Sequence, residues 1–154
     1  MIKLKFNPEL GVLTIKDFEI HDAFREESLN RGLEEKFITR KTKMQPPFSE
    51  YVISPAILWG WRFTMILQFK DGLITHVKLL WIDSDLASRE SWDDIVMADL
   101  TGDFKKLFAF VAEKVSIESI HPSNGSAVWS YPWGNIAVWS EDRSYTEGIM
   151  ISWV

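Results

Sequence analysis

The fold is decided by residues 59–82, which read WGWRFTMILQFKDGLITHVKLLWI. From Trp59 to Phe69 a large apolar residue occupies every second position, and most of the residues between are polar or charged. This period of two is typical of a half-buried β-strand. Asp71 and Gly72 form a turn pair, so residues 73–82 are predicted to return as the second strand of an antiparallel hairpin.

The length of the turn follows from the pairing that keeps polar side chains off the apolar face. A two-residue loop would place His76 and Lys78 among the apolar residues. A loop over residues 70–72 pairs Phe69 with Leu73 instead, and a slip of one residue exchanges the two faces of a strand. We therefore predict a three-residue loop with its glycine in the left-handed conformation. The further predicted pairs are Leu67–Thr75, Met65–Val77, Phe63–Leu79 and Trp61–Trp81.

A helix is predicted from Asp103, because apolar residues follow at helical spacing and form one continuous stripe. This helix should lie on the apolar face of the sheet. A shorter helix from Ser91 to about Leu100 should precede it, with Gly102 interrupting the two. The stripe consists of Phe104, Leu107, Phe108, Val111, Ala112 and Val115.

The remaining residues predict further strands and one more helix around this hairpin. The expected class is α+β, a mainly antiparallel twisted sheet packed on one side by amphipathic helices, in a single domain over residues 1–154. The expected elements are strands at Ile2–Phe6 and Val12–Ile15, a helix at 17–30, a strand or extended arm at 35–43, a short apolar run at 51–53 ended by Ser54-Pro55, a loop at 121–125, a strand at 128–131 and a closing hairpin of 135–140 with 145–153.

Composition narrows the class of protein. The 154 residues include no cysteine, which excludes disulfides and thiolate chemistry. The N-terminus has no apolar run long enough for a signal peptide, so we expect a soluble, cytoplasmic protein that does not enter a membrane. The net charge of −5 argues against a general nucleic-acid binder, which would usually be basic.

The negative charge is concentrated in one segment. Residues 83–103 hold seven acids and one base, whereas the rest of the chain holds fifteen acids and sixteen bases. One interpretation is helix capping and solubility. The other is a docking face for a basic partner, because clustered charge speeds encounter and rejects wrong partners. The candidate partner-binding residues are Asp83, Asp85, Glu90, Trp92, Asp93 and Asp94.

The predicted tip of the closing hairpin, from Trp139 to Tyr145, is a second candidate surface. Aromatic rings lie at its ends, with two acids and an arginine between them. Aromatic and arginine side chains are common anchors at interfaces. The alternative is a plain solvated hairpin.

No residue set predicts catalysis, and we expect a non-enzymatic protein without cofactor or metal. His21, His76 and His121 are far apart and match no metal-ligand spacing. Asp83 and Asp85 could hold a divalent cation, or serve an enzyme together with His21, but they also suit a solvated loop before a helix. A further alternative is a small-ligand cavity between sheet and helix. It would be lined by Trp61, Trp81 and Phe108.

Three features of the chain are Thr14-Ile15-Lys16-Asp17-Phe18, the hairpin pattern of Phe63, Leu67, Phe69, Asp71, Gly72 and Ile74, and Tyr131-Pro132-Trp133-Gly134 before the final hairpin. Together they resemble those of a loose set of small, mostly uncharacterised bacterial proteins, several of them tied to toxin–immunity loci. The resemblance implies a cytoplasmic inhibitor of a cognate toxin, and an acidic inhibitor suits a basic nuclease toxin. It carries over no functional residue, and it implies nothing about oligomeric state.

Overall fold

The structure is a computed structural model that describes residues 1–34, 37–43, 45–84, 97–123, 125–141 and 146–153. Eleven strands and two α-helices are formed within these residues. They are β1 (Ile2–Asn7), β2 (Val12–Ile15), β3 (Phe18–Ile20), α1 (Glu26–Gly32), β4 (Arg40–Lys43), β5 (Phe48–Leu58), β6 (Trp61–Lys70), β7 (Leu73–Trp81), α2 (Met97–Ala112), β8 (Ile120–Ser123), β9 (Ser126–Tyr131), β10 (Gly134–Glu141) and β11 (Thr146–Trp153).

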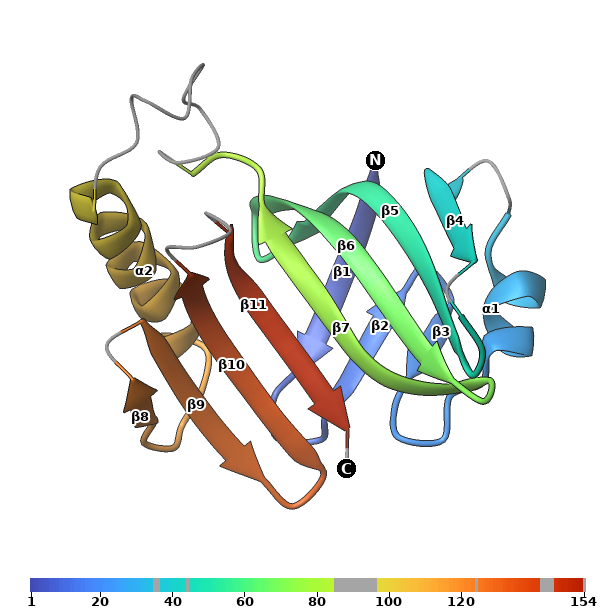
Figure 1. The fold of residues 1–154 in the computed structure, drawn as a ribbon. Coiled ribbons are helices and arrows are strands. Elements are labelled where there is room, and N and C mark those ends of the chain that lie inside the picture. The colour runs from blue at the N-terminus through green and yellow to red at the C-terminus, as the bar shows by residue number, and fades with distance from the viewer. Residues whose placement is uncertain (35–36, 44, 85–96, 124, 142–145, 154) are drawn as a thin grey trace.

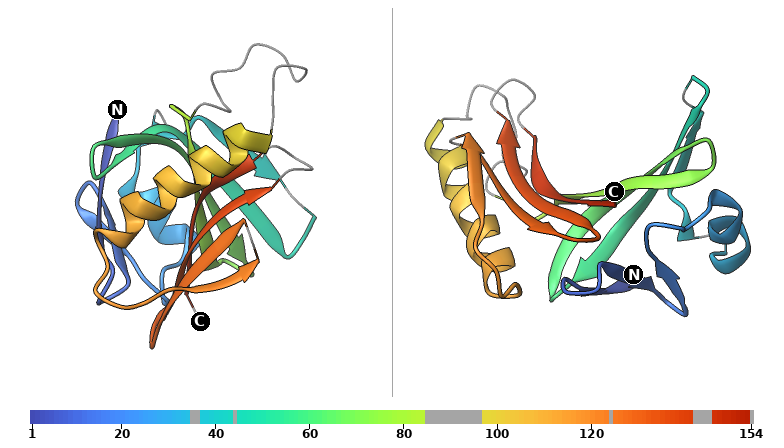
Figure 2. Two further views of the ribbon diagram at one scale, coloured as in Figure 1. Left: turned by 90° about the vertical axis from the view of Figure 1, so that its left-hand side faces the viewer. Right: turned by 90° about the horizontal axis from the view of Figure 1, so that it is seen from below.

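All the strands belong to one strongly curved sheet (Figures 1 and 2). Its order is β3-β2-β1-β5-β6-β7-β11-β10-β9-β8, and β4 pairs with the remaining part of the β5 edge. The β1–β5 pair is parallel, and the other pairs are antiparallel. The predicted class is therefore confirmed in its coarse form, although the sheet dominates and the helices are few.

The concave face of the sheet forms the core. On β6, for example, Phe63, Met65 and Leu67 are fully buried, whereas the residues between them are partly exposed. The same alternation continues across the sheet as far as Trp129 on β9. Strands that bury one face only are expected to alternate in this way. In the described part of the chain, the convex face is thus the more exposed one.

Tryptophan side chains join two distant parts of the curved sheet, the β1–β2 hairpin and the strands β9 to β11. The indole Nε1 of Trp133, after β9, donates a hydrogen bond of 2.8 Å to the carbonyl of Pro8, in the turn between β1 and β2. Trp153, at the end of β11, donates to the Gly11 carbonyl at 2.7 Å. Phe6 packs edge-on against Trp133. Strands that are far apart in the sheet order are therefore held together around the core.

The structure confirms the β6–β7 hairpin and the faces of its residues, but the predicted three-residue loop is wrong. Lys70 pairs with Leu73, so the loop is Asp71-Gly72, and both residues have positive φ as a type I′ turn requires. A register shift follows at Thr75, so that Gln68 pairs with His76. This bulge returns the polar residues to the convex face.

Every predicted pair of this hairpin is consequently displaced. Met65 lies opposite Leu79 rather than Val77, and Phe63 lies opposite Trp81 rather than Leu79. Val77 and Leu79 nevertheless share the buried face with Met65. The predicted face of each side chain is therefore correct. The chain reaches this arrangement through one extra residue in the strand β7 and not through a longer loop.

The predicted amphipathic helix is confirmed, with a small rotation of its buried stripe. Leu107 and Val111 are fully buried, and Phe104 and Phe108 pack beside the core. Phe110, outside the predicted stripe, is also buried and stacks on Trp61 at 4.0 Å. The helix α2 covers the concave face mainly over β10 and β11. Gly102 does not interrupt it, because α2 is continuous from Met97 to Ala112.

Other predicted boundaries are also corrected. The helix predicted for 17–30 is instead the strand β3 followed by the short α1, which begins at Glu26. Ser54-Pro55 does not end β5, which continues to Leu58 after a register shift. The loop predicted at 121–125 overlaps β8, which spans Ile120–Ser123. The closing hairpin is confirmed as β10 and β11.

The short helix α1 is anchored to β5 by its first residue. Ser49 and Tyr51 donate hydrogen bonds of 2.6 and 2.5 Å to the Glu26 carboxylate. Burial raises the pKa of Tyr51, and its hydrogen bond to Glu26 raises that pKa further.

Neither described helix has the length and apolar content needed to cross a bilayer.

Candidate functional site

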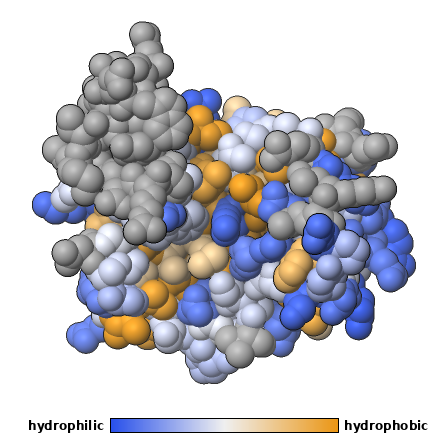
Figure 3. Space-filling view, viewed as in Figure 1, coloured by the Kyte–Doolittle hydropathy of each residue, from blue (hydrophilic) through white to orange (hydrophobic). Residues whose placement is uncertain are grey.

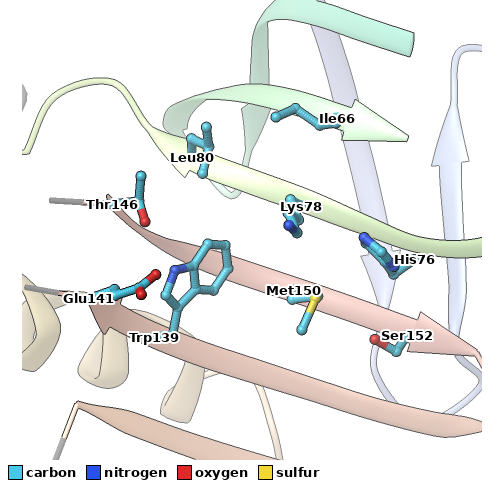
Figure 4. Close-up of a pocket in the computed structure, with 9 residues that line it drawn as sticks. All are labelled: Ile66, His76, Lys78, Leu80, Trp139, Glu141, Thr146, Met150 and Ser152. Atoms are coloured by element: carbon cyan, nitrogen blue, oxygen red, sulfur yellow. The ribbon is translucent and has the colours of Figure 1, made fainter. Parts of the chain in front are cut away.

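An open groove on the convex face is a candidate site formed by described residues. It has a volume of about 560 Å³ and runs along β7, β11 and β10 (Figure 4). Figure 3 shows hydrophobic side chains gathered across the middle of this face, among hydrophilic ones. We call it the Trp139 groove. Its lining residues are Ile66, His76, Lys78, Leu80, Trp139, Glu141, Thr146, Met150 and Ser152.

Strand register explains why these side chains meet. Leu80 on β7 lies opposite Gly148 on β11, which in turn lies opposite Trp139 on β10. Two positions along, Lys78 lies opposite Met150. Side chains of one face repeat every second residue, so the groove consists of successive rows across three neighbouring strands.

Gly148 lies between Leu80 and Trp139 in the register and carries no side chain into the groove. A Cβ atom at this position would lie 2.2 Å from the Leu79 carbonyl oxygen and 3.1 Å from Cη2 of Trp139. The indole therefore lies close to the bare backbone of Gly148, in the space a side chain would need. A glycine inside a strand often marks such a close approach.

The charges of the groove are unevenly placed. Lys78 and His76 both come from β7, and they line the same wall. Glu141 lies toward the end of β10, near the opposite end of the groove (Figure 4). The described part of the chain offers Lys78 no ion pair. The β7 wall thus presents positive charge beside apolar side chains.

Burial lowers the pKa of His76 below its ordinary value of 6.5, and the nearby charge of Lys78 lowers it further. As the pH falls, the unfolded chain consequently takes up this proton before the folded protein does. The folded state should lose stability as the pH falls below about 6.5, until the folded-state pKa is passed.

We expect His76→Gln to remove this part of the pH dependence. Urea unfolding of both proteins at about pH 7.5 and about pH 5 measures this contribution. The other ionisable groups are the same in both proteins, so the difference between the two isolates the effect of His76. The wild type should lose more unfolding free energy than the variant over this interval. An equal loss in the two proteins would show that His76 is protonated as readily in the folded state as in the unfolded chain.

The predicted acidic face is only partly within the described residues. Asp83 is described, and its carboxylate accepts hydrogen bonds from Nε and Nη2 of Arg62. Arg62 lowers the pKa of Asp83 through this contact. Asp103, at the other end of the acidic segment, is buried in α2 rather than on the surface. Asp85, Glu90, Trp92, Asp93 and Asp94 lie outside the described residues.

The aromatic residues proposed to line a cavity do not all line one space. Trp61 is stacked between Trp81 and Phe110, with centroid separations of 4.5 and 4.0 Å. These three rings border an open pocket of about 450 Å³ beside Asp83. Phe108 is not part of this pocket, and it stacks on Trp129 at 5.4 Å.

Of the candidate acid–base residues His21, Asp83 and Asp85, the structure describes the first two, and each contacts another residue. Nδ1 of His21 lies 3.4 Å from Oδ1 of Asp22, whereas Asp83 contacts Arg62. Among the residues with described positions, no three His, Cys, Asp or Glu side chains are grouped so that they could hold a metal ion.

The sequence predicts part of the Trp139 groove but not the whole. Trp139 was predicted as an interface residue of the hairpin tip, and His76 and Lys78 were predicted on the outer face. The other end of that tip, residues 142–145, lies outside the described part of the chain. The missed residues, Met150 and Leu80, alternate outward along strands whose pairing in the sheet the sequence does not reveal.

Fold and site together define a sheet-dominated α+β domain with a filled concave face and an open, partly apolar convex face. Comparison with known protein families, with curated proteins and with solved structures finds no match.

Proposed function

We propose that the protein is a non-enzymatic interaction domain that binds another protein through the Trp139 groove. The observation that supports this proposal is that apolar side chains of neighbouring strands line an open groove on the convex face. Both helices lie away from this face (Figure 1). Tryptophan and methionine are enriched in protein interfaces, and Trp139 and Met150 supply both. Contiguous apolar surface on a folded domain commonly marks an interaction site.

More specifically, we propose an immunity protein that neutralises a cognate bacterial toxin in the cytoplasm. The acidic segment of residues 83–103 supports a basic toxin, because its charge would steer the encounter. The groove wall on β7 is positive, so the groove and the acidic segment would contact different parts of the partner.

Coexpression with the product of the adjacent gene tests this function. If that product is a toxin, this protein should restore growth and bind it directly. Trp139→Ala should abolish protection and weaken binding about thirtyfold, the effect of losing roughly 2 kcal/mol at an interface anchor. Asp93→Asn with Asp94→Asn should slow association and flatten its salt dependence.

Ile120→Ala is the matched control, because Ile120 is exposed on β8 and outside the groove. This variant should bind and protect as the wild type does. Absence of binding to the adjacent product would contradict the immunity proposal. Binding that Trp139→Ala leaves unchanged would remove the groove from the interface.

A small-ligand-binding domain is the alternative function. The open pocket beside Trp61, Trp81 and Phe110 favours it, since stacked rings and a few charged groups suit a flat organic ligand. Because these rings already stack on one another, a ligand could reach only their outer surfaces. For this reason the alternative ranks second.

A further inference from the structure

The shape of the Trp139 groove restricts what can occupy it. It extends along the strands from Thr146 to Ser152, which is roughly 20 Å at about 3.4 Å per residue. A volume of about 560 Å³ over this length makes a shallow trough rather than a deep pocket. Such a trough accepts a row of side chains from one elongated segment.

The walls of the trough determine the character of that row. Leu80, Met150 and Trp139 make the middle apolar. An α-helix of about 13 residues spans roughly 20 Å and presents apolar residues three and four positions apart along one face. Laying such a stripe into an apolar groove is a common mode of peptide recognition.

Charge determines what should lie beside the stripe. Lys78 stands on the β7 wall next to the apolar middle, and the described residues supply no ion pair for its ammonium group. A bound segment that covered Lys78 without a counter-charge would pay the cost of burying an unpaired charge. A carboxylate on the bound segment would remove this cost.

We propose that the Trp139 groove binds an amphipathic helical segment of a partner protein, with its apolar stripe on Trp139 and Met150 and acidic residues facing Lys78. This inference rests on the proposed protein-binding function and adds the chemistry of the segment that is bound. The partner can be basic overall and still present this locally acidic segment.

Two designed peptides of about 14 residues test the inference, since this length matches the trough. Both carry the same leucine stripe, and the residues flanking it are glutamates in one and lysines in the other. Binding is followed by NMR through the Met150 methyl and Trp139 indole signals. The buried Met65 and Trp129 serve as internal controls.

The glutamate-flanked peptide should shift the signals of Met150 and Trp139, bind at least tenfold more tightly than the lysine-flanked peptide, and leave Met65 and Trp129 unchanged. Lys78→Glu should reverse this preference, and Lys78→Gln should abolish it. A charge reversal at one position cannot act this way through general loss of structure.

Four results would overturn the inference. They are an absence of selective shifts, equal binding of the two peptides, a preference that Lys78→Glu does not alter, and shifts caused by octanoate but by neither peptide. The last result would assign the groove to small anionic amphiphiles. A fifth result, groove signals that move with protein concentration alone, would also overturn the inference and assign the groove to a second copy of the chain.

The peptide and adjacent-gene experiments separate the inference from the proposed function. If the peptides fail but Trp139→Ala still loses the partner, the groove binds protein of another chemistry. If the peptides bind but Trp139→Ala keeps the partner, the proposed function falls and the groove has a different target.

Discussion

Replacing Trp129 by alanine is expected to lower the free energy of unfolding by about 3–5 kcal/mol, the usual cost of truncating a buried large aromatic side chain. Trp129 is only 1% exposed, lies on the concave face of β9 and stacks on Phe108 of α2. Its loss would leave a cavity between the sheet and this helix. Urea unfolding monitored by circular dichroism measures the change.

Trp139→Ala is the matched control, since it removes the same side chain from the opposite face of the neighbouring strand β10. There the indole is only partly buried and borders an open groove, so its truncation leaves no closed cavity. We expect a loss of about 1 kcal/mol or less. Equal losses for the two tryptophans would contradict the assignment of core and open faces.

Gly148→Ala should destabilise the protein by about 3 kcal/mol, at the upper end of the usual cost of overpacking. The new methyl group would lie 2.2 Å from the Leu79 carbonyl oxygen, which is backbone and cannot move without disturbing β7. It would also push against the indole of Trp139. Groove binding should therefore weaken together with stability.

Gly102→Ala is the opposite case and serves as the control. Gly102 lies within α2, and an added Cβ meets nothing within 4 Å. Alanine should stabilise this helix position by about 0.5–1 kcal/mol, because glycine is a poor helix former. If Gly148→Ala is as stable as the wild type, β11 cannot approach β7 as closely as described.

Local patterns in the sequence predicted the elements that bury one face. The alternation from Trp61 to Phe69 and the helical stripe around Leu107 and Val111 each report burial directly, and the structure confirms both. The pattern of buried residues does not reveal which turn or bulge places each side chain on its face. The bulge at Thr75 and a longer loop both keep His76 outside, so the sequence pattern could not choose between them.

Errors in the N-terminal half have a different physical origin. The acids near Asp17 and Glu26 suit a helix start, but the chain forms β3 because Phe18 to Ile20 pairs with β2. Tertiary pairing overrides weak helix propensity in such short segments. The continuous helix through Gly102 shows the converse, since packing on the sheet outweighs the cost of one glycine.

The candidate site was the least predictable part, because it depends on strand order. Lys78 and Met150 are far apart in the sequence and become neighbours only when β7 pairs with β11. Alternation places each of them on an outward face, but neither segment contains a pattern that predicts its pairing with the other strand. The acidic segment was conspicuous in sequence, whereas Asp103 within it is buried.

Hydroxyl-radical footprinting of the free protein, read by mass spectrometry, is the most direct test of the arrangement of the two faces of the sheet. In this arrangement one face of the sheet forms the core while the other is open to a partner. Trp139 and Met150 on the convex face should be oxidised rapidly, whereas Trp129 and Met65 on the concave face should be protected. Protection of Trp139 and Met150, or rapid oxidation of Trp129 and Met65, would contradict this arrangement.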